Sequence, residues 1–166
     1  MKKTLIVIDM QNDFIDGSLG TDKAVKIVPN VRKKIEEYRS NGDEIIFTRD
    51  THGEDYLSTP EGKKLPVVHC VKNTHGWQIA DGLDVPDAIH IDKPSFGYTH
   101  WDKFCFEKIE LVGLCTDICV VSNALILKAL FPNAEISVDS ACCAGVTPET
   151  HNSALATMKM CQIDVM

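Results

Sequence analysis

The stretch of residues 110–128 constrains the fold of this chain more than any other part of it. An apolar run at residues 109–112 is short and rich in β-branched residues, as expected of a buried strand. Gly113 interrupts this run, and from residue 116 or 117 onward apolar residues recur at three- and four-residue spacing until Phe131. The pattern predicts a strand, a sharp turn and a helix in immediate succession.

Cys119 falls in the first turn of this predicted helix, just beyond the carboxyl end of the strand. The free N–H groups and the positive dipole end of a helix favour a thiolate, so we expect a lowered pKa and a nucleophilic sulfur. The same N–H groups are suited to hold an oxyanion that forms on a substrate carbonyl. A cysteine at an arbitrary position is more often a small buried hydrophobe. The strand–turn–helix setting is what favours a nucleophile here.

Length and composition indicate one globular domain spanning residues 1–166. Hydrophobic residues make up 44% of the chain and charged residues 25%, which is typical of a folded protein in water. A net charge of −7 and the lack of a long Lys/Arg cluster argue against a nucleic-acid partner. The apolar run at residues 4–8 is too short for a signal peptide or a membrane span. The seven cysteines are therefore interpreted as free thiols, and we expect a cytoplasmic protein without a membrane partner.

Strand and helix patterns alternate along the rest of the chain. Besides 109–112, strands are predicted at residues 4–8, 44–48, 88–91, 134–138 and 161–166. Helices are predicted around residues 28–38, at 99–108 and from Thr147 onward, whereas residues 54–84 show little periodicity. Such alternation implies βαβ units. We expect a three-layer αβα fold of the α/β class around a six-stranded, mostly parallel sheet.

Reactive side chains follow four of these strands. Asp9, Asp50, Lys93 and the segment 113–119 each come after a predicted strand, and sites on open parallel sheets gather at the carboxyl ends of the strands. In that arrangement Asp9 is suited to take the proton of Cys119, and Lys93 to hold both anions by its charge. Taken singly, each residue has a simpler and better interpretation: Asp9 as a helix or turn cap, and Lys93 as an ordinary surface lysine.

A metal site is the second hypothesis drawn from the residues. Asp50 and His52 are two residues apart, so in an extended chain their side chains point to the same side. With His69 they supply one carboxylate and two imidazoles, a set that suits zinc, iron or manganese. An alternative thiolate site would use four cysteines: Cys115, Cys119, Cys142 and Cys143. Because two of these are adjacent in sequence, tetrahedral coordination by all four is disfavoured.

Five motifs follow one another across nearly the whole chain. They are Ile8-Asp9-Met-Gln-Asn-Asp-Phe14, Arg49-Asp50-Thr-His52, His69-Cys-Val-Lys-Asn-Thr-His-Gly76, Asp92-Lys93-Pro-Ser-Phe96 and Gly113-Leu-Cys-Thr-Asp-Ile-Cys119. In content and order they resemble the isochorismatase-like cysteine hydrolases, and most closely the nicotinamidases (pyrazinamidases). The segment that contains His69 is the one that favours nicotinamidases over their relatives.

The resemblance implies a role for each matching residue. The catalytic triad would be Asp9, Lys93 and Cys119. The ligands of a divalent metal, most simply zinc, would be Asp50, His52 and His69. The backbone N–H groups of Cys115 and Cys119 would form the oxyanion hole, with a cis peptide bond between Leu114 and Cys115. The residues that line the substrate pocket would be Phe14, Phe96 and Tyr98.

The activity implied by the resemblance is hydrolysis of a small carboxamide through a thioester. Nicotinamide, giving nicotinate and ammonia, is the first candidate substrate, with the metal orienting it, and a homo-oligomer is possible. Departures from the family pattern are Thr51 and Gly53 in place of tryptophan and proline, Pro66 in place of a ring-stacking tryptophan, and Asn73 in place of a glycine. They leave the triad residues intact.

Two other functions are compatible with the sequence. One is a metal-free hydrolase of the isochorismatase or carbamoyl-amide type, which would leave Asp50, His52 and His69 without a common task. The other is a non-catalytic redox or binding domain in which Cys115 and Cys119 respond to an oxidant.

Overall fold

A six-stranded sheet, parallel throughout, forms the centre of the molecule in the computed structural model, which describes residues 2–166. The strands are β1 (Lys3–Ile8), β2 (Glu44–Asp50), β3 (Ile89–Lys93), β4 (Lys108–Leu114), β5 (Glu135–Ala144) and β6 (Asp164–Val165). Their order across the sheet is β3-β2-β1-β4-β5-β6. The predicted α/β fold with a parallel sheet is therefore confirmed, and no antiparallel strand pair occurs in this sheet.

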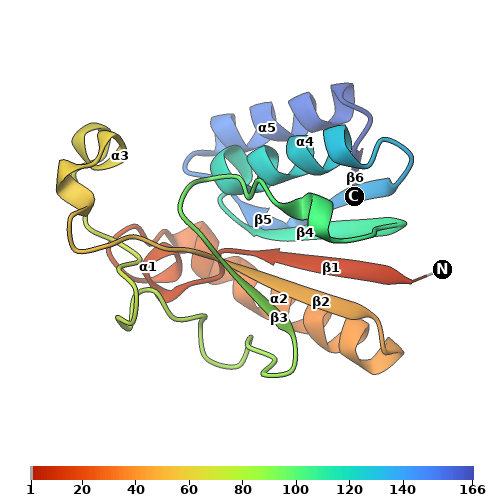
Figure 1. Ribbon diagram of the computed structural model, residues 1–166, viewed down its shortest axis with the longest axis horizontal. Helices are drawn as coiled ribbons and strands as arrows, with labels where there is room; N and C mark the ends of the chain where they lie inside the picture. Colours follow the sequence, from red (N-terminus) through yellow and green to blue (C-terminus); the bar gives the residue numbers. More distant parts are fainter. Residues whose placement is uncertain (1) are drawn as a thin grey trace.

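Helices cover both faces of the sheet and complete the three layers. The helices are α1 (Asn12–Ile15), α2 (Asp22–Asn41), α3 (Pro60–Lys64), α4 (Val121–Leu130) and α5 (Pro148–Met160). Shorter turns are η1 (Tyr56–Ser58), η2 (Trp101–Lys103) and η3 (Thr116–Val120), the last with π-helical geometry. Figure 1 shows α4 and α5 on one face of the sheet and α2 on the other. None of the helices in residues 2–166 is long and apolar enough to cross a membrane.

Alternation along β1 divides the interior into two cores. Leu5 and Val7 pack with α2, whereas Ile6 and Ile8 pack with α4 and α5, and all four side chains are fully buried. Successive residues of a strand point to opposite faces, and both faces of this central strand are covered. This explains why the sequence shows an unbroken apolar run here instead of an alternating pattern.

The predicted helix at 99–108 is wrong, since only the short turn η2 forms there. Trp101 is fully buried among aromatic rings, and Phe104 stacks on Phe106 with ring centroids 5.5 Å apart. These contacts hold the chain extended as it enters β4. Conversely, the stretch without periodicity contains α3, which begins with a Thr59 cap and a proline in its first turn.

Gly113 lets β4 pass close to β1 at the edge where both strands end. Its φ is +123°, and a Cβ at this position would collide with the carbonyl oxygen of Ile8. Only glycine combines this φ with such an approach. The close passage brings the residue after β1, Asp9, next to the turn that follows β4.

Candidate active site

Asp9, Lys93 and Cys119 meet at the carboxyl-terminal edge of the sheet. Asp9 directly follows β1, Lys93 is the last residue of β3, and Cys119 lies in η3 between β4 and α4. The Lys93 Nζ lies 2.6 Å from Asp9 Oδ2 and 3.5 Å from Cys119 Sγ. Asp9 and Lys93 are fully buried, and Cys119 is 4% exposed. The structure thus brings together the three residues that the sequence predicts as a triad.

Neighbouring groups fix the orientation of this acid–lysine pair. The Thr48 hydroxyl donates a hydrogen bond of 2.7 Å to Asp9 Oδ1, so both carboxylate oxygens have partners. The Lys93 ammonium also donates to the carbonyl oxygen of Ser95 at 3.1 Å. The Asp9 backbone has a positive φ of 47°, a conformation that aspartate tolerates better than most residues. The pair is therefore held rigidly behind the cysteine.

Burial controls the protonation of the three groups. Burial raises the pKa of Asp9, and the Lys93 charge offsets only part of this rise. Burial acts to lower the pKa of Lys93, but the charges of Asp9 and Cys119 outweigh it and raise that pKa. Burial, followed by the Asp9 charge, raises the pKa of the Cys119 thiol well above its usual range. The lowered cysteine pKa expected from the helix start is therefore wrong, and a base must remove the thiol proton before attack.

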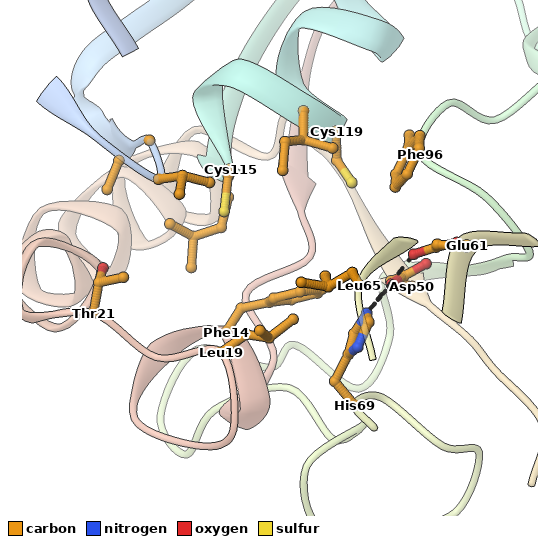
Figure 2. Close-up of a pocket in the computed structure, with 15 residues that line it drawn as sticks. Phe14, Leu19, Thr21, Asp50, Glu61, Leu65, His69, Phe96, Cys115 and Cys119 are labelled. Carbon is orange, nitrogen blue, oxygen red and sulfur yellow. Dashed lines mark ion pairs between the residues drawn. The ribbon is translucent and has the colours of Figure 1, made fainter. Parts of the chain in front are cut away.

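Residues 115–119, which we call the nucleophile turn, lie between the end of β4 and the start of α4. The peptide bond between Leu114 and Cys115 is cis, as predicted. The Cys115 carbonyl oxygen accepts hydrogen bonds from the N–H groups of Ile118 and Val120, at 3.1 and 3.0 Å. This wide turn carries Cys119 to the cavity in front of the sheet (Figure 2).

Four side chains gather beside these residues in a metal-type cluster: Asp50, His52, Glu61 and His69. One ligand atom from each lies within 4.8 Å of the others. The closest pair is His52 Nε2 and Asp50 Oδ2 at 2.9 Å, and His69 Nε2 lies 3.4 Å from the same oxygen. Glu61 comes from α3, which lies beyond the carboxyl-terminal edge of the sheet, at the left of Figure 1.

The chemistry of this cluster fits a divalent cation. Asp50 Oδ1 is buried and has no hydrogen-bond partner, which is unfavourable for a carboxylate unless an ion binds it. Burial acts to raise the pKa of Asp50, but hydrogen bonds with His52 and His69 outweigh it and keep this group ionised. The Val67 carbonyl oxygen lies 2.8 Å from His69 Nδ1 and orients the ring, as outer partners of metal-bound histidines do. Two carboxylates and two imidazoles are ligands typical of zinc, iron or manganese.

A cavity of about 230 Å³ lies between the cluster and the nucleophile turn. Figure 2 shows Asp50, Glu61 and His69 at one end, Cys119 and Phe96 nearby, and Thr21 and Cys115 toward the other end. The residues that line the cavity are Phe14, Leu19, Thr21, Asp50, Glu61, Leu65, His69, Phe96, Leu114, Cys115, Ile118, Cys119, Ala144, Gly145 and Val146. Most of the wall is apolar, and Cys119 is the member of the predicted triad that reaches it.

The predicted pocket aromatics divide into two groups. Phe14 and Phe96 line the cavity, and the Phe14 ring lies 5.5 Å from that of His69. Tyr98 does not line it, because its ring packs edge-on against Trp101 in the α4 core at 5.0 Å. Leu65, the residue before Pro66, supplies part of the wall. Asn73 has the positive φ, 67°, that its place in a glycine position suggests.

Comparison with known proteins agrees with this geometry. The family model described as the isochorismatase domain matches residues 3–166. The chain belongs to the isochorismatase family. The nicotinamidase of Saccharomyces cerevisiae is 26% identical over 214 residues, covering 99% of each chain. An Arabidopsis thaliana protein named a probable inactive nicotinamidase is 33% identical over 178 residues, covering 93% of this chain and 87% of the relative. The crystal structure of the Pyrococcus horikoshii pyrazinamidase in complex with zinc is 27% identical, has a TM-score of 0.83 and covers 100% of this chain and 99% of that one.

Two buried amides support the site of this isochorismatase-family chain without lining its cavity. Gln11 donates to the Asp50 carbonyl oxygen at 2.9 Å and accepts from the Asp50 N–H at 2.8 Å, which holds the end of β2 in place. Asn123 in α4 donates to the carbonyl oxygens of Cys119 and Phe96, at 2.8 and 3.1 Å. Both side chains are fully buried. Helix α4 is mainly apolar, with Ser122 and Lys128 as its other polar residues, so a polar side chain there was the available sequence signal for Asn123.

Glu61 is the member of the metal-type cluster that the sequence analysis missed. It lies in the stretch without periodicity, and a single glutamate outside a motif carries no signal of metal binding. Burial and the neighbouring Asp50 charge raise the pKa of Glu61, which reflects its close approach to the other three side chains. Its position in space, rather than its sequence context, joins it to the cluster.

Proposed function

We propose that this isochorismatase-family protein is a metal-dependent amidase that cleaves a small neutral carboxamide, with nicotinamide as the first candidate. The observation that carries the proposal is the buried contact of Asp9, Lys93 and Cys119 behind a cavity whose other end is a cation-type cluster. Similarity to nicotinamidases and a pyrazinamidase over nearly the whole chain supports the same assignment.

The reaction begins with transfer of the Cys119 thiol proton to Asp9, since the raised pKa of this thiol requires a base in contact with it. The thiolate attacks the amide carbon, and the N–H groups of Cys115 and Cys119 stabilise the oxyanion. The C–N bond then breaks, and Asp9 returns its proton to the leaving nitrogen, which departs as ammonia. Lys93 balances the negative charges of Asp9 and Cys119 throughout.

Hydrolysis of the thioester completes the cycle. Asp9 removes a proton from a water molecule, whose oxygen attacks the thioester carbon. The C–S bond breaks, the carboxylic acid leaves, and the sulfur recovers the proton from Asp9. The same base thus acts in both halves of the reaction, which is why Asp9 must lie against the nucleophile.

A divalent ion would be held by Asp50, His52, Glu61 and His69. Its chemistry when bound is that of a Lewis acid for the ring nitrogen of a pyridine or pyrazine, so that it orients the substrate. The zinc complex of the related pyrazinamidase favours zinc, and iron and manganese also suit these ligands. Phe14 lies beside His69 at this end of the cavity, where it can pack on a substrate ring.

The cavity also favours an amide over the alternative substrates. Its volume of about 230 Å³ lies below the ~300–1,000 Å³ that is common for ligand sites, and so small a cavity suits a single ring. Of the described residues that line it, none is Lys or Arg. A carboxylate-bearing substrate of the isochorismatase or carbamoyl-amino-acid type would therefore lack a cationic side chain to pair with.

Ammonia release from a panel of amides tests the proposal. Nicotinamide, pyrazinamide, benzamide and an N-carbamoyl amino acid are assayed with and without a chelator, beside the Cys119→Ala variant as the inactive control. We expect release from nicotinamide and pyrazinamide, which both carry a ring nitrogen meta to the carboxamide, loss of release with chelator, and recovery with zinc. Preferred cleavage of the carbamoyl compound in chelator would favour the metal-free hydrolase. No release from any amide would favour a non-catalytic protein, like the Arabidopsis relative by its name.

A further inference from the structure

The first turn of α5 anchors two residues of the nucleophile turn. Thr116 is fully buried, and its hydroxyl lies 2.7 Å from His151 Nδ1. The Asp117 carboxylate accepts hydrogen bonds from the Thr150 hydroxyl and from the Val146 N–H, the latter at 3.0 Å. Consecutive residues of the turn are thus tied to consecutive residues of one helix.

The helix end that makes these bonds is itself well fixed. Thr147 and Thr150 form a reciprocal capping box, and Pro148 occupies the first turn. Further along α5, Met158 is fully buried in the core. Gly145 packs so closely on α5 that an added Cβ would lie 2.7 Å from the Cβ of His151. The start of α5 can therefore act as a rigid support.

The loop before α5 lines the cavity, but the side chains that form these hydrogen bonds do not: Thr116, Asp117, Thr150 and His151. Ala144, Gly145 and Val146 form part of the cavity wall, whereas Thr116 and His151 are not among the residues that line it. These two side chains therefore do not touch a ligand in the cavity. Any influence on the reaction must act through the position of the nucleophile turn.

We propose that Thr116 and His151 are positioning residues for the amide hydrolysis proposed above, on which this inference rests. Their hydrogen bond, together with that of Asp117 to Thr150, holds the nucleophile turn so that Cys119 Sγ and the N–H groups of the turn face one substrate carbonyl. Displacing reacting groups by about 1 Å can lower a rate about 10²-fold without any change in the groups themselves. Loss of the anchor should therefore lower kcat and leave KM unchanged.

Paired substitutions at both ends of the bond test this role. Thr116→Val removes the hydroxyl at nearly constant shape, and Thr116→Ser keeps it. On the helix, His151→Leu removes the ring nitrogen, and His151→Asn places a polar atom near the position of Nδ1. Thr157→Val is the matched control, because Thr157 is an exposed threonine of α5 remote from the turn. Melting temperature and bound zinc are measured for each variant to verify folding.

We expect kcat for nicotinamide to fall about 10- to 100-fold in Thr116→Val and His151→Leu, with KM and zinc content unchanged. Thr116→Ser and His151→Asn should recover most of this loss, and Thr157→Val should match the wild type. Equal losses in the Val and Ser variants, or a raised KM with kcat unchanged, would overturn the positioning role.

The rate of Cys119 alkylation by iodoacetamide separates this inference from the proposed function. If the wild type releases no ammonia, the proposed function is wrong, and the alkylation rate then reports on the turn alone. The positioning role is supported if the alkylation rate of Thr116→Val differs from that of the wild type and the rate of Thr116→Ser equals it. Identical rates in all variants contradict it. Should Thr116→Val fail to fold, the two His151 variants test the same hydrogen bond from the helix.

Discussion

Asp50 and Lys93 are partners in the parallel ladder between β2 and β3, at the last residue of each strand. In-register neighbours project to the same face of a sheet, so this pair places the metal-type cluster directly beside the acid–lysine–cysteine group. The Asp50 charge is among those that raise the pKa of both Lys93 and Cys119. A cation bound by Asp50 would therefore offset the Asp50 charge and lower the pKa of the Cys119 thiol.

The first prediction follows from this coupling and concerns pH. Because the pKa of Cys119 lies well above the ordinary thiol value of about 8.5, its thiolate fraction at neutral pH is small and grows as pH rises. Alkylation of Cys119 in the metal-free protein, followed by peptide mass spectrometry, should keep accelerating beyond pH 9. Zinc should move the profile to lower pH, and Asp50→Asn should do the same without zinc. A plateau near pH 7 would contradict the raised pKa.

The second prediction separates the two effects of Asp9 on the cysteine. Asp9 raises the pKa of Cys119 by its charge, yet it is the proposed proton acceptor. Asp9→Asn should speed alkylation of Cys119 at pH 7 and at the same time lower amide turnover by about 10²- to 10⁴-fold. A parallel loss of both alkylation and turnover would instead indicate that the substitution distorts the site.

The third prediction concerns the stability of the buried ion pair. Asp9→Asn leaves the fully buried Lys93 ammonium without its counter-ion, and breaking a buried pair in this way costs about 3–5 kcal/mol. Adding Lys93→Met should restore most of the lost free energy of unfolding, whereas amide turnover should stay as low as in Asp9→Asn. Urea unfolding of the single and double variants measures this difference, and a double variant no more stable than Asp9→Asn would contradict the explanation.

The fourth prediction tests Glu61 as a member of the cluster. Glu61→Gln keeps the size of the side chain and removes its charge. Loss of a residue that only orients a metal ligand lowers metal affinity about 10- to 100-fold. Loss of a ligand should lower zinc affinity at least as much. Competition with a chromophoric chelator measures the affinity. Glu54→Gln, an exposed glutamate of the same segment, is the control. Equal affinities of the two variants would remove Glu61 from the site.

The fifth prediction compares two glycines that both have positive φ. Gly42 caps α2 at φ +72° with open space around it, so Gly42→Ala should cost only the left-handed penalty of about 1–2 kcal/mol. Gly113→Ala adds a collision with the Ile8 carbonyl oxygen and should be clearly more destabilising. Chemical unfolding of both variants checks the order, and similar losses would show that β1 and β4 can move apart.

Much of this architecture could be predicted from local patterns. Buried strands such as β1 and β4 are recognisable as apolar runs in the sequence. Because sites gather at the carboxyl ends of parallel strands, the strand pattern also predicts that Asp9, Lys93 and Cys119 lie at one edge of the sheet. The failures occurred where long-range packing decides the outcome. Trp101 and Phe106 replace a predicted helix by an aromatic cluster, Tyr98 turns into that cluster, and Glu61 reaches the metal-type site only because α3 folds over it. The raised pKa of Cys119 likewise depends on burial that one helix pattern does not reveal.

The four hydrogen bonds of the Asn123 side chain limit which residues can replace it. Its amide nitrogen serves the carbonyl oxygens of Cys119 and Phe96, and its oxygen serves the Tyr98 N–H and the Trp101 indole. Aspartate has the same outline but no donor when ionised, and leucine has neither function. Among side chains of this size, asparagine alone satisfies all four partners, so the contact between α4 and residues 96–101 should tolerate no other residue at position 123.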